Sequence, residues 1–161
     1  MTAEEYNDAV KKHSDGIYRF ILKNIRDEER ARDIVQDSYE KLWLHHLQVN
    51  ADAVKSYLYS TAYHRLIDVV RKDNRLSLAG SQPPGEQIHC DQYTDLSEVL
   101  HQIIQLLPND QRSVLMLRDY EGYSYREIAE ITTLSEAQVK VYIYRARVFM
   151  KNYIGKIDVL I

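Results

Sequence analysis

Apolar residues recur at spacings of three and four along almost the whole chain, which is the pattern of amphipathic helices. Thr2 precedes the first such stretch, and Glu5 lies three residues after Thr2, so the two are expected to form an N-terminal capping pair. We expect a first helix over residues 2–25, a second over residues 27–46 and a third over residues 55–75. Because each of them has one apolar face, the three should pack together as a bundle.

The same spacing predicts which side chains of these helices face the core. Trp43 falls on the apolar stripe of the second helix, so it is expected in the core rather than at a binding surface. The other face of that helix is polar and carries charges of both signs. The expected core positions are Tyr6, Val10, His13, Ile17, Phe20, Ile21 and Ile25 in the first helix, Ala31, Ile34, Val35, Tyr39, Leu42 and Trp43 in the second, and Leu58, Ala62, Leu66 and Val69 or Val70 in the third.

Residues 74–97 interrupt the helical pattern. They contain a Pro-Pro-Gly run and few aliphatic side chains, which is the composition of a linker. Beyond them a helix is expected up to Pro108. Another is expected over residues 109–122, with Asn109 as its N-cap and Gly122 just past its end.

Two capping signals follow in tandem. Ser124 is followed three residues later by Glu127, and Ser135 by Gln138, so each pair can form a capping box at the start of a helix. The two starts lie 11 residues apart, which leaves the first helix about two turns before the chain reverses. This spacing is typical of a helix-turn-helix, in which a short helix supports a longer one.

The second helix of this motif has a distinct outer face. Val139, Ile143, Ala146 and Met150 share the inward side at helical spacing. Amide, cationic and aliphatic side chains at an exposed helix N-terminus are suited to the base edges of the DNA major groove. A solvated face on a bundle helix is the alternative, and the paired caps favour DNA contact over it. The outward positions are Ala137, Gln138, Val141, Tyr144 and Arg145, with Lys140 and Arg147 on the flank.

These elements predict an all-α fold of two small helical domains. Residues 1–75 form the N-terminal helical bundle, residues 97–161 form a C-terminal four-helix domain with the helix-turn-helix, and residues 76–96 form a flexible linker.

Composition and charge narrow the class of protein. Hydrophobic residues make up 45% and charged residues 28% of the chain, as in soluble globular proteins. The net charge is −3, and four acidic side chains against one basic one lie in residues 74–98. Cys90 has no partner for an internal disulfide, and we find no signal peptide or membrane-spanning run, so a cytoplasmic location without membrane insertion is expected.

Three motifs in one short chain carry a family resemblance. They are ARDIVQDSYEKLW, the basic and aromatic third helix, and LPNDQRSVLMLRDYEGYSYREIAEITTLSEAQVKVYIYRAR. Together they resemble a bacterial RNA polymerase sigma factor of the extracytoplasmic-function (ECF) group, which holds sigma regions 2 and 4 joined by a linker. The resemblance implies a protein that directs core polymerase to promoters by recognising the −35 and −10 elements and melting DNA, with no cofactor and no enzymatic activity of its own.

The resemblance also implies site residues and partners. The partners would be promoter DNA, the clamp coiled coil and the flap of core RNA polymerase, and an anti-sigma factor. His64 stands where the family often has Asn, and Thr133 stands where it often has Gly, so a strained corner is expected at Thr133. The residues implied for the clamp are Asp33, Gln36, Asp37 and Glu40; for the −10 element they are Tyr59, Tyr63, His64, Arg65, Arg71 and Lys72; and for the −35 element they are Ser124, Tyr125, Ser135, Gln138, Lys140, Val141, Tyr144, Arg145 and Arg147.

The acidic total fits this class of protein. Nonspecific DNA binding gains its strength from the neutralisation of phosphates, so a net negative charge suppresses it. Two DNA-binding domains of modest affinity can then suffice. Once polymerase supplies most of the affinity, the connection between the domains raises the effective concentration of each at its promoter element.

The sequence is also compatible with three other functional hypotheses. A helix-turn-helix regulator acting alone would explain residues 124–148 but not the first two motifs. A metal-dependent enzyme would have to recruit residues that show no recognisable ligand spacing, namely His45, His46, His64, His89 and Cys90. An adaptor module is compatible with any helical bundle, and failure to bind core polymerase would favour it.

Overall fold

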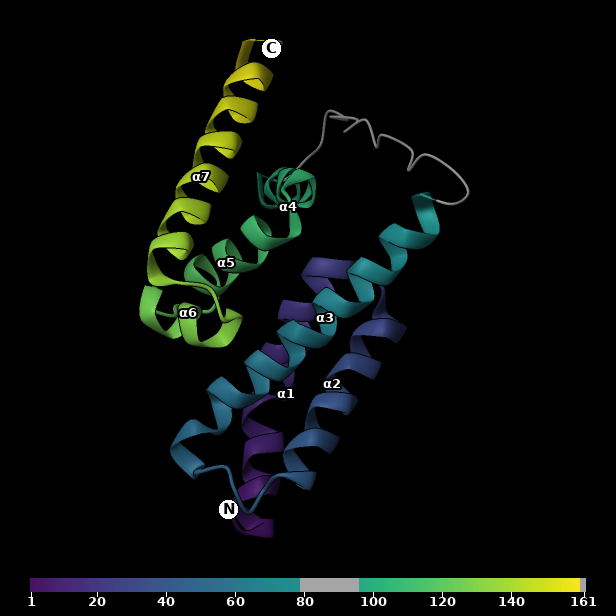
Figure 1. The fold of residues 1–161 in the computed structure, drawn as a ribbon. Coiled ribbons are helices and arrows are strands. Elements are labelled where there is room, and N and C mark those ends of the chain that lie inside the picture. Colours follow the sequence, from purple (N-terminus) through teal and green to yellow (C-terminus); the bar gives the residue numbers. More distant parts are fainter. Residues whose placement is uncertain (79–95, 160–161) are drawn as a thin grey trace.

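The computed structural model describes residues 1–78 and 96–159, and these residues form helices and short connections without any strand. The predicted all-α fold of two helical domains is confirmed (Figure 1). Most of the predicted linker, residues 76–96, lies outside the described residues. The N-terminal domain consists of α1 (Ala3–Ile25), α2 (Glu28–Leu44), the 3-10 turn η1 (Ala51–Ala53) and α3 (Val54–Leu78), and the C-terminal domain consists of α4 (Leu96–Leu106), α5 (Asn109–Asp119), α6 (Tyr125–Thr132) and α7 (Glu136–Val159).

The start of α1 is capped as its sequence predicts. The Thr2 hydroxyl accepts from the Glu5 backbone N–H at 3.2 Å, and the Glu5 carboxylate accepts from the Thr2 N–H at 2.7 Å. This reciprocal pair satisfies two donors that a helix start leaves without partners. The helix ends at Ile25, and the cap residue that follows, Arg26, has a φ of 49° in the left-handed region.

The N-terminal core forms where α1, α2 and α3 meet. Most of the predicted inward positions are buried. The fully buried large side chains of this domain are Phe20, Ile17, Ile21, Ile34, Leu42, Leu58 and Leu66. At about 1.5–3 kcal/mol for each such side chain, their burial is the main stabilising term of the bundle.

The prediction for Trp43 is wrong, because this side chain is 45% exposed. The indole packs edge-on against Tyr6, with ring centroids 5.0 Å apart, and stacks on His46 at 4.6 Å. It lies close to the end of α2, where the core no longer covers both sides of the ring.

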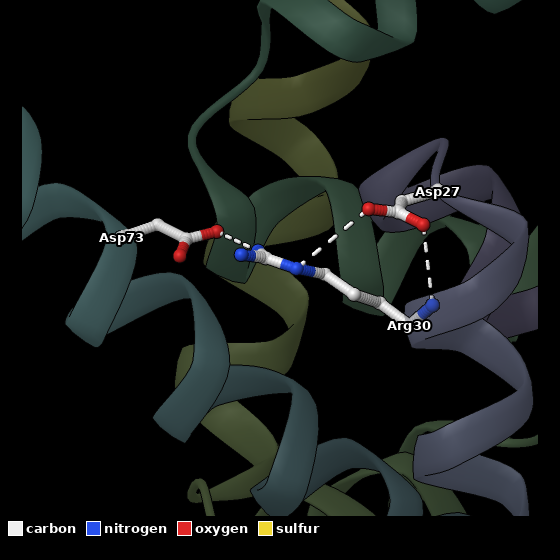
Figure 2. A network of polar contacts seen from close by, with 3 residues as sticks. All are labelled: Asp27, Arg30 and Asp73. Atoms are coloured by element: carbon white, nitrogen blue, oxygen red, sulfur yellow. Dashed lines mark hydrogen bonds and ion pairs between the residues drawn. The ribbon is translucent and has the colours of Figure 1, made fainter.

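A polar network at the outer surface joins α2 to α3 (Figure 2). The Arg30 backbone N–H donates to the Asp27 carboxylate at 3.2 Å, which caps α2, and the Arg30 side chain pairs with Asp73 on α3. Both side chains of the second pair are nearly half exposed. Solvent screening therefore limits its contribution to about 1 kcal/mol or less.

The C-terminal domain is built around α5, which packs on α6 and α7. Asn109 is the first residue of α5 and not its N-cap, so that prediction is wrong. Pro108 occupies the cap position, and the Asn109 side chain instead accepts from Arg112 at 3.3 Å. Gly122 adopts a positive φ of 74° after the helix, as a residue without Cβ can readily do.

The two domains are in direct contact (Figure 1). Helix α6 lies against α3, and α5 lies against α1. A buried hydrogen bond crosses this boundary, from the Ser113 hydroxyl of α5 to the Asn24 side-chain oxygen of α1 at 3.2 Å. The chain therefore folds as two bundles that share one interface.

Candidate functional site

One polar face of α2 carries the residues predicted for the polymerase clamp. Asp33, Gln36 and Glu40 are exposed, and Asp37 is partly covered. The Asp37 carboxylate pairs with the Arg65 guanidinium of α3 at 3.2 Å. The structure thus joins a residue predicted for polymerase to one predicted for DNA.

The residues predicted for the −10 element divide into two groups on α3. His64, Arg65, Arg71 and Lys72 are exposed and can reach a ligand. Tyr59 and Tyr63, in contrast, are only 2% and 4% exposed. Burial is the main cause that raises the pKa of both tyrosines, so both hydroxyls are protonated over the physiological range.

Helices α6 and α7 form the predicted helix-turn-helix. Ser124 caps α6 by accepting from the Glu127 N–H at 3.2 Å, while the Glu127 carboxylate accepts from the Ser124 hydroxyl. Ser135 and Gln138 make the full reciprocal box at the start of α7, with bonds of 3.0 and 3.1 Å. The predicted paired caps are therefore present, the second more completely than the first.

Thr133 forms the corner between α6 and α7 with a φ of 59°. A β-branched residue in the left-handed region is uncommon, and the conformation costs roughly 1–2 kcal/mol relative to a right-handed one. Its hydroxyl donates to the Thr132 carbonyl at 2.6 Å, which helps to hold the corner. The strained corner expected from the sequence is thus observed.

The N-terminal half of α7 presents an uninterrupted exposed face. Val139, Ile143 and Ala146 are buried beneath it, at 0%, 2% and 0% exposure. Tyr144 is 70% exposed and Val141 is 43% exposed. The side chains of this face are Gln138, Lys140, Val141, Tyr144 and Arg145, all of them exposed.

Two cations border this face through the partly buried ring of Tyr125, the first residue of α6. The Arg118 guanidinium lies 4.7 Å from the ring centroid and the Lys140 ammonium lies 5.8 Å from it. Cations so placed are attracted to the ring, which orients Lys140 along the exposed face. Sequence reasoning missed Arg118, because it belongs to the preceding helix and only the fold brings it here.

Arg147 has a different environment from the other predicted −35 residues. Its guanidinium donates to the Asp119 carboxylate of α5 at 2.8 Å. It also lines an apolar groove of about 440 Å³ between α4, α5 and α7, which sequence reasoning missed. The apolar stripe of α4 was the available signal. The groove's apolar lining consists of Leu100, Ile104, Leu115, Tyr120, Met150 and Ile154.

The structure describes three of the five residues considered for a metal site, namely His45, His46 and His64. Across residues 1–78 and 96–159, no group of three or more His, Cys, Asp or Glu side chains is placed to hold an ion. His89 and Cys90 lie outside the described residues. Among the helices that the structure describes, none has the length and apolar character to cross a membrane.

Two family models and several known proteins are similar to this chain in sequence. The family model "Sigma-70 region 2" matches residues 9–76, and the model "Sigma-70, region 4" matches residues 97–150. The ECF RNA polymerase sigma factor SigM of Bacillus subtilis is 28% identical over 162 residues, covering 94% of each chain. The RNA polymerase sigma factor YlaC of the same organism is 29% identical over 163 residues, covering 95% of this chain and 94% of the relative.

Solved structures share the fold. The sigma factor RpoE in complex with the anti-sigma factor NepR, from Bartonella quintana, superposes with a TM-score of 0.78 at 21% identity, covering 95% of this chain and 98% of that chain. CnrH in complex with the cytosolic domain of CnrY superposes with a TM-score of 0.70 at 20% identity, covering 94% and 88%.

Proposed function

The chain belongs to the sigma-70 family of RNA polymerase sigma factors, and from this premise we propose that it acts as an ECF sigma factor that directs core RNA polymerase to promoters. Such a protein is a transcription initiation factor and performs its work by binding. In this proposal residues 1–75 act as region 2 and residues 97–161 act as region 4, within the cytoplasm.

The exposed face of α7 is the observation that carries the proposal. A capped helix start places an amide, a cation and an aliphatic side chain next to one another with nothing packed over them. Gln138 and Arg145 can hydrogen-bond base edges, and the Val141 methyl groups can contact a thymine methyl. Lys140 and Arg118 can meet phosphates on either side. We assign the −35 element to this face.

Polymerase would be held at two places. The acidic face of α2, with Asp33, Asp37 and Glu40, suits a cationic helical partner such as the clamp coiled coil, because complementary charges set register and speed encounter. The apolar groove between α4, α5 and α7 suits an apolar segment such as the flap. Two separate contacts tether both domains to one large partner, which raises their effective concentration at promoter DNA.

An anti-sigma factor is proposed as the negative regulator. The sigma factor RpoE named above was solved with an anti-sigma factor, and CnrH with the cytosolic domain of CnrY. This chain offers two surfaces that a partner could cover, an acidic helix face and an apolar groove. A protein that covered either one would exclude polymerase.

Paired variants test the division of roles. Arg145→Ala should weaken promoter-specific run-off transcription by about 10- to 100-fold, equivalent to about 1–3 kcal/mol for a lost base contact, while core polymerase is still bound. Lys140→Ala should also weaken it with polymerase binding retained, but equally for all promoter sequences, because it removes a phosphate contact. Asp37→Arg combined with Gln36→Ala should abolish polymerase association while circular dichroism shows an intact helical fold. Equal loss of both activities in both sets would refute the assignment.

A stand-alone helix-turn-helix regulator is the second candidate, favoured by the completeness of the α6–α7 motif. It predicts tight duplex binding by the chain without polymerase. An electrophoretic mobility assay at physiological salt separates the two, since the sigma-factor proposal predicts weak binding by the chain alone.

A further inference from the structure

A cavity of about 610 Å³ opens where α1, the η1 turn and the start of α3 meet. Of the side chains that line it, Tyr59 alone has been given a role above. The Tyr59 hydroxyl donates to the Glu121 carboxylate of the C-terminal domain at 3.1 Å, and both residues belong to the lining. Ligand pockets commonly have volumes of about 300–1,000 Å³, so a small organic ligand fits into this space.

Gly16 of α1 leaves room for the Tyr59–Glu121 pair at the wall of the cavity. A Cβ atom at this position would lie 2.6 Å from the Tyr59 hydroxyl, nearer than nonbonded atoms approach, and 3.7 Å from the Glu121 carboxylate. Glycine in the middle of a helix is unfavourable in itself. Here it allows the hydroxyl to reach Glu121, and this bond commits one of the three carboxylates that line the cavity.

Three cationic side chains, Lys12, Arg19 and Lys55, also line the cavity, and all three are exposed. Within residues 1–78 and 96–159, none of them forms an ion pair with a carboxylate. Cations that gather around a concave surface focus a positive potential there and attract anions. Phosphate groups are favoured partners, because several N–H donors can bond to their oxygens at once.

His13 shows the sign of the potential beside the two lysines. Burial lowers the pKa of this imidazole below its ordinary value of 6.5, and Lys12 and Lys55 lower it further. Both electrostatic contributions come from cations, so the potential around the ring is positive. The Lys55 ammonium also lies 4.6 Å from the Tyr123 ring centroid, a contact that restrains its position.

The two remaining carboxylates narrow the class of ligand. Asp15 and Asp52 line the same cavity and are exposed. In the part of the chain that the structure describes, neither forms an ion pair. A carboxylate accepts hydrogen bonds from hydroxyl and amino groups but repels a bare phosphate. The lining therefore suits a ligand that joins phosphate groups to hydroxyl or amino donors, and a nucleotide has this combination.

We propose that the cavity is a binding site for a small nucleotide, whose phosphate groups lie between Lys12 and Lys55. Arg19 supplies a third cation. Asp15 and Asp52 accept hydrogen bonds from the sugar hydroxyls or from an amino group of the base. The proposal goes beyond the function proposed above and does not rest on it, because it uses only the cavity and its lining.

Binding of defined probes to the full chain tests the site. Calorimetric titrations with ADP, GDP and pyrophosphate are made in a buffer with EDTA, so that the free anions are the ligands. At least one nucleotide should bind at one site per chain and about fivefold or more tighter than pyrophosphate, since it adds a net hydrogen bond to a carboxylate. The NMR signal of the His13 ring should then titrate at a higher pH, because the bound phosphate offsets the two lysines.

Three results of these titrations would overturn the proposal. One is the absence of nucleotide binding up to about 10 mM, which is weaker than any useful affinity. Another is pyrophosphate binding as tight as that of both nucleotides, because the carboxylates would then contribute nothing. The third is binding of a single-stranded oligodeoxynucleotide with neither nucleotide bound, which would assign the cavity to a DNA backbone.

Variants of the lining locate the site. Lys55→Ala should weaken nucleotide binding by about tenfold, the effect of one lost charge-assisted hydrogen bond. Asp52→Ala should weaken nucleotide binding while leaving pyrophosphate binding no weaker. Lys11→Ala is the matched control, since this exposed lysine of α1 does not line the cavity. An equal loss in Lys11→Ala and Lys55→Ala would indicate attraction by net charge alone and would refute the site.

Discussion

The buried hydrogen bond between Asn24 and Ser113 allows the contact between the domains to be measured as a free energy. Asn24 is 4% exposed and Ser113 is 0% exposed, and the serine hydroxyl donates to the asparagine oxygen at 3.2 Å. The Asn24 amide nitrogen is already committed to the Phe20 carbonyl at 2.8 Å. Ser113→Ala therefore leaves a buried acceptor without its donor, at a cost of about 1–3 kcal/mol.

A double-mutant cycle isolates this interaction. Asn24→Leu, Ser113→Ala and the double variant are unfolded in urea together with the parent chain, and the coupling free energy is expected at about 1–2 kcal/mol. In a thermal scan, each 1 kcal/mol corresponds to a shift in Tm of about 2–4 °C for a chain of this size. If α1 and α5 did not touch, both groups would be hydrated. A coupling below about 0.3 kcal/mol would then be found, and it would refute the packing of the domains.

Three further predictions follow from local geometry. Ser135→Ala should lower the free energy of unfolding of the chain by about 1 kcal/mol, and Ser124→Ala should lower it by no more than this. The reason is that only Ser135 belongs to a full reciprocal capping box. Denaturant unfolding of both variants tests which loses more stability. Trp43, the only tryptophan, should show red-shifted fluorescence that acrylamide quenches readily, whereas a blue-shifted, protected emission would contradict its 45% exposure. Burial, followed by two nearby lysines, lowers the pKa of His13 below its ordinary value of 6.5. The unfolded chain therefore binds this proton more tightly, so stability should fall as the pH drops below 6.5, and His13→Gln should remove that part of the dependence.

Local signals made most of the helices predictable. The capping residues Thr2, Ser124 and Ser135 act within three residues of themselves, so the sequence specifies their contacts directly. The outward face of α7 could also be predicted, because it depends only on which residues occupy the opposite, buried side. For these elements, periodicity and capping are the physical causes of the structure.

The errors arose where tertiary context decides. Trp43 continues the apolar stripe of α2. The stripe predicts only the side of the helix on which the ring lies, and not whether another helix covers that side. Asn109 is a residue type that favours the N-cap position, yet Pro108 occupies that position and Asn109 is the first residue of the helix. Both mistakes concern the ends of elements. For Trp43 the outcome depends on which other helices cover the ring, and for Asn109 it depends on the adjacent Pro108.

The contact between the domains could not be predicted at all. Tyr59 and Glu121 are 62 positions apart in the sequence, and both are residue types that often face solvent, so neither one signals a contact with the other domain. Gly16 lies in the middle of α1, and only the structure explains it, because a Cβ atom there would lie 2.6 Å from the Tyr59 hydroxyl. The site residues themselves remain predictions until variants are measured.

Run-off transcription from a randomised promoter library, with purified core polymerase in the presence and absence of the chain, tests the central claim most directly. We predict that the chain selects promoters that share two short elements at a fixed separation, and that core enzyme alone selects none. Identical transcripts with and without the chain would contradict its assignment as a promoter-specificity factor.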